Sequence, residues 1–114
     1  MSEKLAKLAA LADMIKEAEL GRLSAAETAR RAIARQSATV RAAMSNANRQ
    51  AEPDAAHVSG TAAHWHIWAD RRLKALTLQE AMTAAEAEVQ RRAASRAFGR
   101  AAALGSLAQR STKD

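Results

Sequence analysis

The sequence contains no cysteine, no tyrosine and one proline, and its three aromatic residues are two tryptophans and one phenylalanine. Without cysteine, a disulfide framework and a thiolate metal site are both excluded. So small a number of aromatic side chains does not provide the repeated stacking platforms that bind single-stranded nucleic acid. β-branched residues are few and scattered, so β-strands have little support as well.

Long hydrophobic runs are also absent. The segment Met1–Lys7 interleaves charged residues with leucine and alanine, and so lacks the continuous apolar core of a secretory signal. No later run is long enough to cross a bilayer. We therefore expect a cytoplasmic protein without stable membrane insertion.

What the chain has in abundance is alanine, arginine and other strong helix formers, in a length of 114 residues that fits one domain or less. Alanine buries little apolar area. At roughly 25 cal/mol per Å², a seam of alanines therefore stabilises a fold weakly compared with a leucine core. This composition favours long helices that share a thin seam over a compact globule, and we predict an all-α fold.

The first arm is predicted to be helical over residues 3–49. Its apolar residues recur at the three-and-four spacing of a coiled coil. The predicted stripe consists of Leu5, Leu8, Ala12, Ile15, Ala26, Ala29, Ile33, Val40, Ala43 and Ala47. Two interpretations of Gly21 are open. In the first, Gly21 ends one helix and Ser24–Glu27 forms the capping box of a second helix. In the second, Gly21 lies inside a single helix and destabilises it by about 1 kcal/mol relative to alanine.

A turn is predicted over residues 50–61, in the region where turn-forming residues are densest. Pro53, the only proline, marks a helix stop, and Thr61 is predicted to be the N-cap of the next helix. The second arm then covers residues 62–106, followed by a frayed tail over 107–114. One interruption near the middle of the chain predicts two long helices that fold back as an antiparallel coiled-coil hairpin.

No enzymatic chemistry is predicted. A two-helix hairpin has no deep interior, and the sequence has neither a glycine-rich phosphate loop nor a serine with an identifiable base. His64 and His66 lie two positions apart, so on a helix they face nearly opposite directions and cannot chelate one ion together. We expect no catalytic residue, no metal and no cofactor.

The stretch from Trp65 to Leu76 holds both tryptophans beside a dense basic run. Because tryptophan and arginine are enriched in binding hot spots, this stretch is the predicted contact with a partner protein. The candidate partner-binding residues are Trp65, Trp68, Arg71, Arg72 and Leu76. Two alternatives are open. In the first, the tryptophans are instead core residues that cover the thin seam. In the second, the chain is instead a structural coiled coil that self-associates through the apolar surface around Leu73, Leu78 and Met82.

The formal net charge of +6 and a pI of about 10.8 favour acidic partners, whether nucleic acid, anionic lipid or an acidic protein. The predicted basic surface includes Arg30, Arg31, Arg35, Arg91, Arg92 and Arg96. A solvated helix face is the alternative interpretation of these arginines. No DNA-binding motif is clear, so nucleic-acid binding stands as the alternative to protein binding, and the alanine stripe is too shallow for a membrane-surface helix.

A short, basic helical hairpin with continuous arms resembles the stalk family of type III export, which comprises the flagellar FliJ group and its injectisome counterpart, the YscO group. The similarity covers Leu5–Ala47, the turn around Pro53 and Trp65–Phe98, and the segment Trp65–Leu73 resembles short FliJ-like proteins of alphaproteobacteria. The resemblance implies a non-enzymatic adaptor at the export apparatus. The end with both termini would insert into the ring of the export ATPase, and another surface would contact the cytoplasmic domain of the export gate or escort export chaperones.

Overall fold

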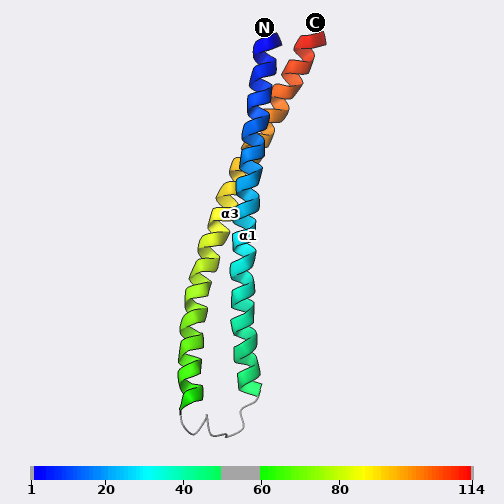
Figure 1. Ribbon diagram of the computed structural model, residues 1–114. Helices are drawn as coiled ribbons and strands as arrows, with labels where there is room; N and C mark the ends of the chain where they lie inside the picture. Colours follow the sequence, from blue (N-terminus) through cyan, green and yellow to red (C-terminus); the bar gives the residue numbers. More distant parts are fainter. Residues whose placement is uncertain (1, 50–59, 114) are drawn as a thin grey trace. The chain divides into compact units, whose positions relative to one another are not determined.

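The computed structural model describes residues 2–49 and 60–113, which form two α-helices and no strand. Helix α1 runs over Ser2–Arg49 and helix α3 over Thr61–Lys113. The helices pack against each other as the predicted all-α hairpin (Figure 1). Most of the predicted turn, including Pro53, lies outside the described residues.

Helix α1 continues without a break through Gly21, so the interpretation of the first arm as one helix is confirmed. A Cβ atom added at Gly21 would meet nothing within 4 Å. At the other end of the chain, the predicted fraying after residue 106 is wrong, because α3 remains helical to Lys113. Ala108 and Ser111 are half-buried, so the last turns still pack and are held in the helix.

The start of α3 depends on Gly60. Its φ angle is +82°, a conformation that glycine adopts without the steric penalty of a Cβ atom. The backbone N–H of His64 donates a hydrogen bond of 3.1 Å to the carbonyl oxygen of Gly60, which is the first bond of the helix. Gly60 therefore occupies the N-cap position, and the prediction that Thr61 is the N-cap is wrong by one residue.

The chain divides into two compact units. Unit 1 contains Met1–Thr28 and Ala85–Asp114, and unit 2 contains Ala29–Ala84. In each unit a segment of α1 lies antiparallel to a segment of α3 (Figure 1). Buried and half-buried positions recur at alternating steps of four and three, which is the heptad pattern of a coiled coil.

The seam of each unit is set by this pattern. In unit 1 it consists of Leu5, Ala9, Ala12, Lys16, Glu19, Leu23 and Ala26 on α1, with Ala87, Gln90, Ala94, Ala97, Ala101, Leu104, Ala108 and Ser111 on α3. In unit 2 it consists of Ile33, Ser37, Val40, Met44 and Ala47 on α1, with Ala62, His66, Ala69, Leu73, Leu76, Glu80 and Thr83 on α3.

The predicted stripe of the first arm is half right. Its members Leu5, Ala12, Ala26, Ile33, Val40 and Ala47 lie on the seam, whereas Leu8, Ile15, Ala29 and Ala43 are exposed. In the described part of the chain, every fully buried apolar residue except Leu76 is an alanine. Leu8 and Ile15 each precede a seam residue by one position, so helical geometry leaves them at the edge of the contact.

Polar pairs across the seam fix the register within each unit. In unit 1, Arg91 binds the Glu27 carboxylate, and Lys16 Nζ lies 5.7 Å from the centre of the Phe98 ring. The hydrogen bond from Arg91 to Glu27 is the largest cause that raises the pKa of Arg91 above its ordinary value. In unit 2, Arg72 donates to Gln36 Oε1 at 3.1 Å. Each pair has at least one exposed partner, so the pairs specify register more than they stabilise the fold.

Candidate functional site

The candidate site is the outer face of α3 in unit 2, which we define as Ile67, Trp68, Arg71, Leu78 and Met82. The exposed fractions are 58% for Trp68, 63% for Leu78 and 64% for Met82. Large apolar side chains exposed singly are ordinary on protein surfaces, but several on one helix face are typical of a binding surface.

Helical geometry explains why these side chains face away from α1. Trp68 and Met82 are each followed directly by a seam residue, so they are turned by one helical step from the seam. Leu78 lies two residues after the buried Leu76, which turns it further toward the outside. Helix α3 therefore has two apolar faces, and α1 covers only one of them.

The structure separates the predicted partner-binding residues into two groups. Trp68 and Arg71 are exposed on the outer face, as a partner contact requires. Leu76 is 0% exposed, so it is a core residue of the seam and the prediction that it contacts a partner is wrong. Its heptad position places it against α1, in the seam of unit 2.

Trp65 and Arg72 have structural contacts of their own. Trp65 is half-buried, and its ring meets the ring of His66 edge-on with 5.1 Å between centroids. Arg72 is exposed but donates its hydrogen bond to Gln36 on α1. Of the two alternatives for the tryptophans, partial burial therefore suits Trp65 and surface exposure suits Trp68.

Unit 2, which carries the outer face, has more basic than acidic residues. Arg71 lies on the outer face, and Lys74 binds Asp70 at 3.1 Å within the same helix. On the α1 side of unit 2, the segment from Ala29 to Arg49 carries five arginines and no carboxylate. An acidic surface is therefore the electrostatic complement of this unit.

The predicted basic surface consists of two groups on different units. Arg30, Arg31 and Arg35 are exposed on α1 in unit 2. Arg91, Arg92 and Arg96 lie on α3 in unit 1, where Arg91 binds Glu27 and Glu88, and Arg92 binds Glu88 at 3.2 Å. Part of the positive charge in unit 1 is therefore neutralised within the chain.

The described residues contain no candidate cluster for a metal ion. No group of three or more histidine, cysteine, aspartate or glutamate residues within them is placed to hold a metal ion. His57, the third histidine, lies outside the described residues. Over the residues that the structure describes, neither helix has a segment long and apolar enough to cross a membrane.

Sequence reasoning missed a second surface, an apolar groove in unit 1 lined by Leu8, Leu11, Ile15 and Leu104 among others. Leu8 and Ile15 were predicted to lie on the seam. The signal was available in the spacing, because Leu8, Leu11 and Ile15 recur at three and four residues on one face.

Comparison of the chain with protein-family models, with curated proteins and with solved structures found no match.

Proposed function

We propose that this chain is a non-enzymatic helical adaptor that binds a partner protein through the outer face of α3. The observation that carries the proposal is the joint exposure of Trp68, Leu78 and Met82 on one face of one helix. Arg71 lies among them, and a tryptophan beside an arginine is the composition of a binding hot spot. Burial of the exposed apolar area supplies the affinity, and the arginine supplies orientation.

The resemblance to export stalks suggests which assembly and which partner proteins the adaptor contacts. In this form of the proposal, the chain is a cytoplasmic component peripheral to a type III export apparatus. It contacts the export ATPase and the cytoplasmic domain of the export gate, or it escorts export chaperones. A net charge of +6 favours approach to acidic surfaces such as the lumen of an ATPase ring.

The test is a titration of the purified chain with a flagellar export ATPase and, separately, with the cytoplasmic domain of the export gate, followed by tryptophan fluorescence. We expect saturable binding in the micromolar range or tighter to at least one of them. The variant Trp68→Ala should bind about 30-fold more weakly, since a hot-spot tryptophan contributes about 2 kcal/mol and 1.4 kcal/mol is tenfold. Affinities of the variant are measured by calorimetry, because it lacks one fluorophore.

The matched control is Leu20→Ala, which removes a partly exposed apolar side chain from α1 in unit 1 and should leave the affinity unchanged. The free energy of unfolding of Trp68→Ala should change by less than about 0.5 kcal/mol. Parallel losses of affinity and stability would place Trp68 in the core. Absence of binding to both partners, by a chain shown to be folded and helical, would remove the export assignment.

Nucleic-acid binding is the second candidate, supported by the five arginines and the absence of carboxylates between Ala29 and Arg49. A nucleic-acid binder loses affinity steeply as salt rises, with a slope set by the number of phosphates it neutralises. Titration of a labelled duplex at several salt concentrations separates the candidates. Tight binding with a steep salt slope, unaffected by Trp68→Ala, would favour the nucleic-acid function over the adaptor.

A further inference from the structure

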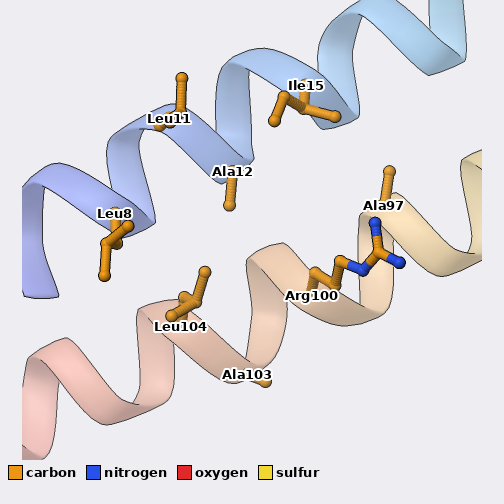
Figure 2. A pocket seen from close by; sticks show the side chains of 8 residues that line it. All are labelled: Leu8, Leu11, Ala12, Ile15, Ala97, Arg100, Ala103 and Leu104. Carbon is orange, nitrogen blue, oxygen red and sulfur yellow. The ribbon is translucent and has the colours of Figure 1, made fainter.

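The groove in unit 1 is a second unpartnered apolar surface, distinct from the outer face of α3. It has a volume of about 320 Å³ and lies between α1 and α3. Figure 2 shows Leu8 and Ala12 pointing from α1 toward α3, while Leu104 points back toward α1. Leu8, Leu11 and Ile15 are each about half exposed.

The groove follows from the thinness of the seam. Ala12, Ala97 and Ala101 are buried on the seam of this unit. These small side chains fill the contact but do not reach the flanking leucines, so the flank of α1 is left without a partner. Leu8 and Ile15 are seven residues apart, so the apolar flank extends over about two helical turns. That is the length over which one partner helix inserts two successive layers of side chains.

The charges around the groove are positive. Arg100 lines it, and none of its other lining residues carries a charge. Lys4 and Lys7 stand one turn before Leu8 and Leu11, so they lie on the same face of α1.

Two carboxylates of α1 near the groove, those of Asp13 and Glu17, are paired elsewhere. Asp13 and Glu17 lie 3.4 and 3.7 Å from the ammonium of Lys16, which does not line the groove.

We propose that this groove binds one amphipathic helix of a partner protein, with an apolar stripe that packs on Leu8, Leu11, Ile15 and Leu104 and carboxylates on its flanks. Acidic flanks complement Arg100 and the two lysines, and opposite charges at the edges of a helical contact set partner choice. A second copy of this chain is disfavoured, because a two-fold contact through the groove would set each Arg100 against an equally basic surface. The inference concerns a different surface from the proposed adaptor site and does not depend on it.

The probe is a synthetic helical peptide of about three heptads, with leucine at a and d and glutamate at e and g. Glutamates at every flank prevent the peptide from pairing with itself. A matched peptide carries lysine in place of each glutamate. Binding to the full-length chain is followed by fluorescence anisotropy of a dye on the peptide, at two salt concentrations.

The acidic peptide is expected to bind at least tenfold more tightly than the basic one. Leu11→Gln should weaken binding at least tenfold, while the control Met14→Gln, exposed on the same helix but outside the groove, should leave it unchanged. Arg100→Gln should also weaken binding and reduce its salt dependence. Trp68→Ala should have no effect, so failure here is distinguishable from failure of the adaptor proposal.

Two results would overturn the inference. Equal affinity for the two peptides, or an affinity that Leu11→Gln does not change, would show that the groove does not select an acidic helix. A dimer of the chain in sedimentation equilibrium that Leu11→Gln dissociates would show that a second copy occupies the groove. Circular dichroism of each variant confirms that it is helical, and because Arg100 is exposed, Arg100→Gln provides a test that does not perturb apolar packing.

Discussion

Replacing Ser37 by alanine should stabilise the protein. Ser37 lies on the seam of unit 2 and is 0% exposed. Among the described residues, its Oγ is the one buried side-chain oxygen or nitrogen without a hydrogen-bond partner. A buried hydroxyl without a partner destabilises a fold by about 1–3 kcal/mol, and alanine exceeds serine in helix propensity by up to about 0.5 kcal/mol. We expect the free energy of unfolding to rise by about 1–2 kcal/mol.

The assay is urea and thermal unfolding followed by circular dichroism at the helical band. For a chain of this length, 1 kcal/mol corresponds to roughly 4 °C in Tm, so the expected shift is about 4–8 °C. The control is Ser95→Ala, an exposed serine of α3 where only helix propensity changes. The difference between the two variants isolates the effect of the buried hydroxyl.

Equal gains in stability from Ser37→Ala and Ser95→Ala would contradict this prediction, because the Ser37 hydroxyl would then have a hydrogen-bond partner in solution. A complementary variant, Ser37→Val, enlarges the side chain at a position with no exposed surface. Overpacking of that kind destabilises by about 1–3 kcal/mol. A neutral Ser37→Val would mean that the helices are less closely packed at this position.

The remaining predictions concern glycine and the core. Gly21→Ala should stabilise the chain by about 1 kcal/mol in urea unfolding, because the helix is continuous there and a Cβ meets nothing within 4 Å. Gly60→Ala should destabilise the chain by about 1–2 kcal/mol, because the φ angle of Gly60 is +82°. Equal effects of Gly21→Ala and Gly60→Ala on stability would contradict the assignment of Gly60 as the N-cap. Leu76→Ala should lower stability by about 2–5 kcal/mol, whereas a loss below 1 kcal/mol would contradict its burial in the seam.

The fold class was predictable from composition and spacing. Strong helix formers with one interruption near the middle predict two helices that fold back, and residues 2–49 and 60–113 have that arrangement. The ends of the helices were less predictable, because fraying depends on tertiary contacts. Ala108 and Ser111 are half-buried against a neighbouring helix, a contact that local sequence does not report.

The seam was predicted only in part, for a physical reason. Reasoning from hydrophobicity placed the bulky Leu8 and Ile15 in the contact, whereas the seam uses the smaller Ala9 and the long Lys16 beside them. Position in the heptad therefore decides which residues enter the seam, and hydrophobicity alone does not identify that position. The exposed apolar side chains of both candidate sites lie at positions that the heptad phase turns away from the seam.

The sequence indicated which stretch of the chain holds the candidate site, but not which residues of that stretch are exposed. The pairing of tryptophan with arginine indicated the right stretch, and Trp68 and Arg71 are exposed there. Leu76 was wrongly assigned to the partner contact, because moving the heptad assignment by one residue exchanges a buried position for an exposed one. Self-association through Leu73, Leu78 and Met82 was the alternative interpretation. Leu73 is half-buried on the seam, whereas Leu78 and Met82 are exposed, which leaves that alternative to be distinguished from partner binding.

The central claim is that the outer face of α3 contacts another protein, and site-specific photo-crosslinking in the host cell tests it most directly. A photoreactive amino acid replaces Leu78, with Ala38, exposed on α1 of the same unit, as the control position. The account predicts that position 78 crosslinks to one protein, identified by mass as an export ATPase, an export-gate subunit or an export chaperone. It also predicts that Trp68→Ala abolishes this product. No crosslinked protein at position 78, or products with nucleic acid or with a second copy of the chain alone, would contradict it.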